Sequence, residues 1–257
     1  MWLQRLAGQS KVRQDPRWSQ LDSLAHAAIQ GNQSVLTQVA GLVAGLRTDL
    51  GARPVDSEIW KLVGSAVAFV CADDVLEAAE EANLKNLCAA LGVQLRDLRA
   101  MNFPAWEELA VARVNDHRPP VLPDPPMIAQ PGETAYATFR VSLMKEVVRR
   151  EFRGRSSGIS VPLGMGVRYR TGSSRGRSVV VGTDLVAADT GQLIITNHRA
   201  LFLGDQKTLE FRRDKLAGLQ QYTDGLRLNV SNRQAPSLFR FGKGESPALA
   251  AALVVAG

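Results

Sequence analysis

The sequence predicts an α+β protein, in which an all-helical N-terminal domain precedes a small antiparallel β-sandwich or barrel that ends in a C-terminal helix. Apolar residues recur at helical spacing through the first 115 residues, and alternation with a period of two begins at Ala135. A proline-rich stretch separates the two patterns, and 257 residues suffice for two domains. We therefore predict a helical domain over 1–115, a linker over 116–132 and a β-domain over 133–257.

Composition places the chain among ordinary globular proteins, since 45% of its residues are hydrophobic and 22% are charged. No apolar run approaches the roughly 20 residues that span a bilayer, and the first residues carry no secretory signal. Cys71 and Cys88 lie in apolar helical patterns, which favours buried, reduced thiols. These features predict a cytoplasmic protein, with peripheral attachment to a membrane left open.

The helical domain carries its own start and stop signals. Asp15 is placed to cap a helix that begins at Pro16, and Gly51 is a natural end for the helix in "SVLTQVAGLVAGLRTDLG". Further helices are expected over 57–71, 74–91, 94–102 and 105–115.

The linker lies in "DHRPPVLPDPPMIAQPGE", which contains six of the twelve prolines of the chain. Because proline fixes φ and lacks a backbone donor, this segment should be a semi-extended spacer or a strap across one domain.

The second half has the pattern of an antiparallel sheet. Alternating apolar residues predict a strand over 135–143, a basic helix is expected over 144–152, and Asp224-Gly225 is a strong hairpin turn. Ser246 before Pro247 marks the start of the terminal helix. Short strands are expected near 159–163, 166–170, 178–186, 192–196, 200–203, 208–212, 218–222, 226–230 and 237–241.

The polar triplet Asn197-His198-Arg199 falls between two of these strands. We interpret it mainly as a corner of the sheet, because asparagine suits a left-handed backbone and bonds locally, and a histidine at a turn tip is usually solvated. Arg199 is a candidate for more than a corner, because its long stem can pack on an apolar face while its guanidinium reaches an anion.

The segment "ADDVLEAAEEANLKNLCAALGV", residues 72–93, resembles the tellurite-resistance B-like helical families. Val75 stands where those families usually have glycine. The three acidic residues Asp73, Asp74 and Glu77 either contact a cation or form a solvated helix start.

The β-domain resembles the pleckstrin-homology-like superfold, including its GRAM-type branch, because short antiparallel strands precede one terminal helix. The likeness is sharpest in "GVRYRTGSSRG", "DTGQLIITNHRALFLG" and "YTDGLRL", which are similar to an uncharacterised family of bacterial modules. The residues that match the core motif of that family are Gly191, Leu193, Ile195, Thr196, Asn197, Arg199, Phe202 and Gly204. The resemblance implies a fold rather than one function, since the superfold hosts lipid-binding, peptide-binding and structural roles.

Catalytic patterns are missing from the sequence. Its three histidines are scattered, its two cysteines lack zinc spacing, and its glycine pairs do not continue as a nucleotide-binding fingerprint. We therefore predict a protein that is not an enzyme and uses no cofactor or metal.

Residues 140–177 concentrate positive charge, with nine arginines and one lysine against two glutamates. This is either a solvated basic face or an anion site, for which the planar fork of arginine is well suited. The candidate anion-binding residues are Arg168, Arg170, Arg175, Arg177 and Arg199. Arg168 and Arg170 share one face of a predicted strand, and a Gly-Ser-Ser bend is expected to return Arg175 and Arg177 over it.

The leading hypothesis is a bacterial adaptor whose β-domain binds an anionic surface or acidic partner and whose helical domain binds protein. An acidic membrane surface ranks first as the partner, then an acidic protein, then nucleic acid, because the basic segment has few aromatic residues for base stacking. The alternative is a structural subunit of a self-assembling or homo-oligomeric complex without a lipid ligand.

Overall fold

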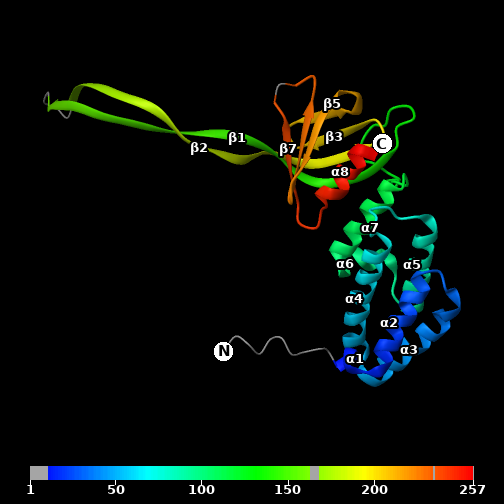
Figure 1. Ribbon diagram of the computed structural model, residues 1–257. Coiled ribbons are helices and arrows are strands. Elements are labelled where there is room, and N and C mark those ends of the chain that lie inside the picture. The colour runs from blue at the N-terminus through cyan, green and yellow to red at the C-terminus, as the bar shows by residue number, and fades with distance from the viewer. Residues whose placement is uncertain (1–10, 163–167, 234, 257) are drawn as a thin grey trace, which may run out of the picture.

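The computed structural model describes residues 11–162, 168–233 and 235–256, and within 148–183 it describes the backbone only. In the described residues of the N-terminal half, helices joined by loops are present and no strand is found (Figure 1). None of the helices described is both long and apolar enough to cross a membrane. The helices are α1 (Lys11–Gln14), α2 (Pro16–Ile29), η1 (Gln33–Val35), α3 (Leu36–Leu50), α4 (Ala52–Val70), α5 (Ala78–Ala90), η2 (Leu95–Asp97), α6 (Leu98–Met101) and α7 (Phe103–Asn115).

The predicted start and stop signals act as expected at two helices. The Asp15 side chain accepts a hydrogen bond from the backbone N–H of Arg17 at 2.9 Å, and Gly51 ends α3 with φ of 86°. Two predicted starts were wrong: α4 begins at Ala52, directly after Gly51, and α5 begins only at Ala78. The delay of α5 has a local reason, because Asp74 has φ of 63° and cannot belong to a right-handed helix.

One apolar core joins the helices of this half, and both cysteines belong to it. Cys71 and Cys88 are free thiols, exposed by 3% and 1%, which confirms that they are buried and reduced. Burial raises the pKa of each thiol to about 12, with nearby carboxylates adding to the effect at Cys71.

The second half forms one seven-stranded antiparallel sheet in the order β4-β3-β2-β1-β7-β6-β5, followed by helix α8 (Pro247–Ala256). This arrangement confirms the predicted α+β class. The strands are β1 (Ala135–Pro162), β2 (Arg168–Thr196), β3 (Arg199–Gly204), β4 (Thr208–Arg212), β5 (Leu216–Gln221), β6 (Gly225–Val230) and β7 (Ser237–Phe241). Helix η3 (Arg213–Lys215) lies between β4 and β5. The predicted hairpin turn is present, because Tyr222 N–H donates to the carbonyl of Gly225 at 2.8 Å.

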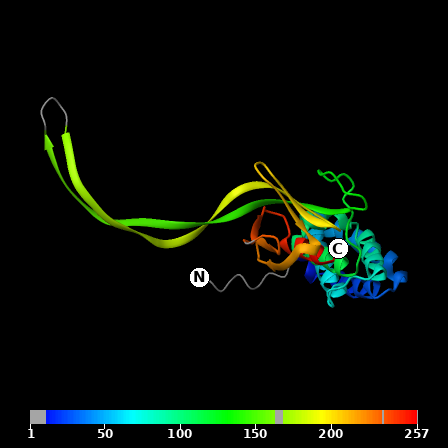
Figure 2. The same ribbon diagram turned by 90° about the horizontal axis from the view of Figure 1, so that it is seen from above.

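The basic helix expected over 144–152 was wrong, because these residues continue strand β1. Met144 pairs with Ala187, and the ladder with β2 runs on to Pro162 opposite Arg168. The β-branched pair Val147-Val148 favours a strand, and pairing with a distant segment outweighs local helical spacing. The short strands predicted on either side are therefore merged into two long ones, which leave the sheet as a two-stranded ribbon (Figures 1 and 2).

Aromatic contacts across the sheet indicate how strongly it curves. Phe239 of β7 lies 5.4 Å from Phe202 of β3 and 5.6 Å from Phe211 of β4, measured between ring centroids. Three strands separate the edge strand β4 from β7, so these contacts require a sheet that curves until β4 and β7 face each other across one core. Helix α8 packs against this core with Leu249 and Leu253, which are 5% and 0% exposed. Its cap is Ser246, whose hydroxyl accepts a hydrogen bond from Leu249 N–H at 2.9 Å.

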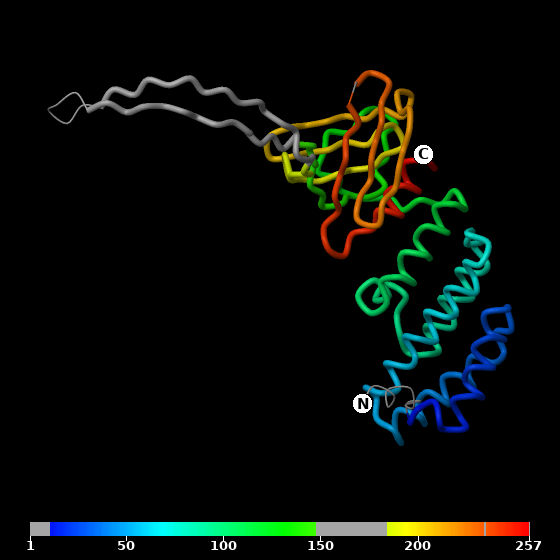
Figure 3. The backbone as a smooth tube through the Cα atoms, turned by 60° about the vertical axis from the view of Figure 1, so that its left-hand side comes forward, coloured from blue at the N-terminus to red at the C-terminus, as the bar shows by residue number. Residues whose placement is uncertain are grey.

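Helix α7 joins the two halves. Its Val114 is fully buried in the core of the sheet, and Trp106 packs against both cores. Figure 3 shows the helical half and the sheet as two bodies joined through this helix. The proline-rich segment lies as a strap rather than a free spacer, because Leu122 N–H donates to the Ala135 carbonyl at 2.8 Å. The sheet therefore has contacts with α7 and with the strap, both of which lie outside the predicted domain of residues 133–257.

Candidate functional site

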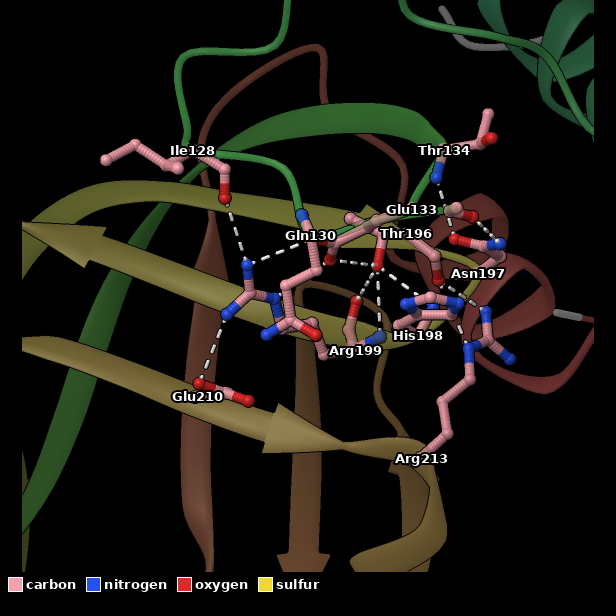
Figure 4. A network of polar contacts seen from close by, with 11 residues as sticks. Ile128, Gln130, Glu133, Thr134, Thr196, Asn197, His198, Arg199, Glu210 and Arg213 are labelled. Atoms are coloured by element: carbon pink, nitrogen blue, oxygen red, sulfur yellow. Dashed lines mark hydrogen bonds and ion pairs between the residues drawn. The ribbon is translucent and has the colours of Figure 1, made fainter.

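The corner after β2 is organised around the guanidinium of Arg199 (Figure 4). Its Nε and Nη2 donate to the two carboxylate oxygens of Glu133 at 2.8 and 3.0 Å, and Nη1 donates to Glu210 at 3.2 Å. Nη2 also donates to the backbone carbonyl of Ile128 in the strap at 3.2 Å. Arg199 is 8% exposed, and the Glu133 side chain is not exposed. The pair is a buried, bidentate ion pair that ties the strap to β3.

The charge states of this pair follow from its contacts. Burial raises the pKa of Glu133, but hydrogen bonds from Arg199, from the backbone of Gln130 and from Thr196 outweigh it, so the pKa lies below its ordinary value. The bond to Glu133 raises the pKa of Arg199, against the opposing effect of burial. The guanidinium of Arg199 does reach an anion, but this anion is a carboxylate of the protein itself.

Thr196 and Asn197 complete the corner. The Thr196 hydroxyl donates to Glu133 at 2.8 Å and accepts from the backbone N–H groups of His198 and Arg199, both at 3.0 Å. Asn197 accepts from Thr134 N–H at 2.8 Å and donates to the Gly132 carbonyl at 2.9 Å. The predicted left-handed backbone at Asn197 was wrong: its side chain holds the start of β1 without a positive φ.

The glycines of the matched motif have a steric role. A Cβ on Gly191 would lie 2.0 Å from the carbonyl oxygen of Leu203, and one on Gly204 would lie 2.3 Å from Asp189 Oδ2. Asp189 occupies that space because its carboxylate accepts from the backbone N–H groups of Gln206 and Lys207 in the following turn. The motif "GQLIITNHRALFLG" is therefore explained by packing, turn formation and one ion pair.

Arg213 is a second organising arginine that the sequence pattern did not reveal. It donates to the Thr196 carbonyl and to the carbonyls of Leu253 and Val254 at the end of α8, at 2.7 and 2.6 Å for the helix. A cation suits this place, because the last carbonyls of a helix lack partners within it. Burial lowers the pKa of Arg213. The capping role of Arg213 becomes visible only in the structure, where the residue after β4 lies against the last turn of α8.

The four other candidate arginines lie on the ribbon, far along β2 from the corner. Their side chains fall outside the described part of the structure. Only their backbone positions are known, from the pairing of β2 with β1. The register sets them opposite β1 as follows: Arg168 opposite Pro162, Arg170 opposite Ser160, Arg175 opposite Arg155 and Arg177 opposite Arg153. Two of the four thus stand directly across from further arginines.

The expected Gly-Ser-Ser bend between these arginines was wrong. Gly172, Ser173 and Ser174 continue the ladder opposite Gly158, Ser157 and Ser156. Glycine and serine suggest a turn locally, but an antiparallel partner of the same composition keeps both strands extended. The structure therefore spreads the four arginines along one strand and does not gather Arg199 with them.

The acidic residues that precede α5 make local hydrogen bonds. Asp73 accepts from Val75 N–H at 3.2 Å in the turn before α5, and the N–H of Glu77, the N-cap of α5, donates to Glu80 at 3.0 Å. Among the residues that the structure describes, no cluster of His, Cys, Asp and Glu has an arrangement that could hold a metal ion. His26 lies against Phe69 and His198 is exposed.

Comparison with known proteins gives no family for the chain, since no family model, curated protein or solved structure matches it.

Proposed function

We propose that the protein is a non-enzymatic recognition module, whose β1–β2 ribbon binds an anionic partner while the helical half binds protein. One observation carries the proposal. Residues 145–186 hold nine lysines and arginines against three acidic residues, a net charge of +6 that equals the net charge of the whole chain. The rest of the chain is neutral in sum, so the ribbon is the part that attracts anions.

The register of the ribbon strengthens this argument. Arg153 stands opposite Arg177 and Arg155 opposite Arg175, so two like-charged cross-strand pairs follow each other. Like charges directly opposite each other destabilise an antiparallel pair. A bound polyanion would offset the repulsion, and arginine binds carboxylate and phosphate oxygens bidentately. The curved sheet with α8 against its core is also consistent with the resemblance to pleckstrin-homology-like modules.

The test measures binding of the full chain to three immobilised polyanions: vesicles containing phosphatidylserine, polyglutamate and double-stranded DNA. Two variants each remove two ribbon charges, Arg168→Gln/Arg170→Gln and Arg175→Gln/Arg177→Gln. Near an acidic bilayer each removed charge should weaken binding by about 1 kcal/mol. Binding should also fall as salt rises, because the attraction is screened.

The matched control is Arg53→Gln/Arg96→Gln, which removes two exposed arginines of the helical half. Wild type and control should bind alike, and both ribbon variants should bind more weakly. Failure of the wild type to bind any of the three polyanions would refute the proposal, as would equal binding by all four proteins.

Self-assembly is the second candidate, and the open strand edges of the ribbon favour it. An exposed strand edge is a template for pairing with another chain. The charge of the ribbon opposes this pairing, because two copies would each bring +6. Size-exclusion chromatography with light scattering separates the candidates: a homo-oligomer that persists on dilution and has no affinity for polyanions would favour the second.

A further inference from the structure

A hollow of about 720 Å³ lies where the ribbon leaves the sheet. Its apolar lining includes Met144 of β1, Leu185 of β2, Tyr222 before the β5–β6 turn and Leu238 of β7. Two of the large hydrophobic side chains that are exposed in the described residues line this hollow. They are Leu185 and Tyr222, exposed by 53% and 39%. Grouped exposed apolar residues mark interaction surfaces.

One side of the hollow is an open strand edge. β1 pairs with β7 only from Val141 to Met144, and from Lys145 onward its described ladder runs along β2 alone. β7 begins at Ser237, and the residue before it, Pro236, is unsuited to continue the pairing along β1. The register in which Met144 faces Leu238 would set Pro236 opposite Glu146, and proline has no backbone N–H to donate. A row of backbone donors and acceptors on β1 thus lies beside the hollow. Figure 1 shows β1 and β2 leaving the sheet as a two-stranded ribbon.

A third feature of the hollow is Arg227 of β6, which also lines it. Its Nε is buried and has no hydrogen-bond partner in the described part of the molecule. A buried donor without a partner is costly, so an acceptor that entered the hollow would be stabilised there. Lys145 adds positive charge to the lining and Glu146 adds negative charge, while Arg240 forms an ion pair with Asp224 at 3.1 Å.

We propose that the anionic partner is an extended acidic polypeptide segment, which adds to β1 as a strand from Lys145 onward and places apolar side chains in the hollow. The inference rests on the proposed function for the negative charge of the partner. An open strand edge matches a polypeptide backbone, and the pockets beside it accept alternate side chains. A flat bilayer does not enter a hollow, and a second basic ribbon is repelled by the first.

The probe is an octapeptide of alternating Glu and Val with blocked ends and a fluorescent label, titrated with the full chain and followed by anisotropy. The variant Leu185→Ser/Tyr222→Ser removes apolar lining without changing charge. Its matched control is Val255→Ser/Met101→Ser, which alters two exposed apolar residues elsewhere. We expect the lining variant to bind the peptide about tenfold more weakly and the control to bind like wild type. A peptide with alternate N-methylated amides should bind wild type about tenfold more weakly as well, because it lacks the backbone N–H donors that pair with β1.

Each other outcome overturns the inference. The inference is refuted if the lining variant binds the peptide as tightly as wild type does, or if wild type binds the methylated peptide as tightly as the unmethylated one. It is also refuted if wild type binds vesicles or DNA more tightly than the peptide and the lining variant keeps that affinity. The proposed function is judged separately, with Arg175→Gln/Arg177→Gln. If this variant loses the peptide while the lining variant keeps it, the hollow is wrong and the ribbon stands. If both variants keep it, both proposals fail.

Discussion

The two ends of strand β2 carry arginines in opposite circumstances. At the corner that follows β2, Arg199 is buried and bound by Glu133 and Glu210. Toward the other end, Arg175 and Arg177 stand opposite further arginines in a ribbon of net charge +6. An arginine whose carboxylate lies within the protein stabilises the fold, and we propose that arginines in excess of local carboxylates bind an external anion. On this proposal, the presence of a counter-charge, rather than membership of a motif, separates structural arginines from binding arginines.

The largest expected effect is the loss of the corner pair. Arg199→Ala leaves the unexposed carboxylate of Glu133 without its main partner. Breaking one side of a buried ion pair costs about 3–5 kcal/mol of unfolding free energy. Urea denaturation of the full chain measures this change directly. Arg212→Ala is the control, since its ion pair with Asp214 is solvent-exposed and such pairs contribute about 0–1 kcal/mol.

The same pair predicts a pH dependence. The pKa of Glu133 is lowered in the folded protein, so its contribution is complete above the unfolded pKa and is lost as the pH falls through the folded pKa. Glu133→Gln should flatten that part of the stability profile. A wild-type profile that is unchanged by Glu133→Gln, or equal unfolding midpoints for Arg199→Ala and Arg212→Ala, would contradict a buried and charged corner.

The next effect concerns the close approach of β2 and β3. Gly191→Ala places a Cβ where the carbonyl oxygen of Leu203 lies 2.0 Å away, and a backbone atom cannot rotate aside. Overpacking of this kind costs about 1–3 kcal/mol. Gly41→Ala is the control, because nothing lies within 4 Å of its added Cβ. Thermal unfolding should rank Gly191→Ala well below Gly41→Ala; the reverse order would refute the steric explanation of the motif.

A smaller effect is expected at the cap of α8. Ser246→Ala removes the acceptor of the Leu249 N–H bond, and loss of such a cap costs about 1 kcal/mol. Ser65→Ala is a suitable control, since this serine only bonds back to the Lys61 carbonyl within its own helix. Urea midpoints that do not distinguish the two variants would show that the contacts of α8 with α7 and the sheet outweigh its cap.

Local rules predicted much of this fold and little of its long-range pairing. Asp15, Gly51, Asp224-Gly225 and Ser246-Pro247 act through neighbours in the chain, so their roles follow from residue type and spacing. The ribbon depends on a partner about forty residues away at Met144, and short windows cannot contain that information. For the same reason the sequence indicated Arg199 but not its partner Glu133, and it missed Arg213, whose acceptors belong to the last helix. The hollow beside Leu185 likewise arises from four segments brought together by the sheet.

The claim that the ribbon, and not the corner, holds the functional arginines is tested most directly by one variant that carries Arg168→Gln, Arg170→Gln, Arg175→Gln and Arg177→Gln. Its affinity for polyglutamate and its urea unfolding midpoint are measured beside those of wild type. We predict that binding falls by more than tenfold at low salt, since each 1.4 kcal/mol is a factor of about 10, while unfolding free energy changes by no more than about 0.5 kcal/mol. Unchanged affinity, or a loss of stability as large as that of Arg199→Ala, would contradict the account.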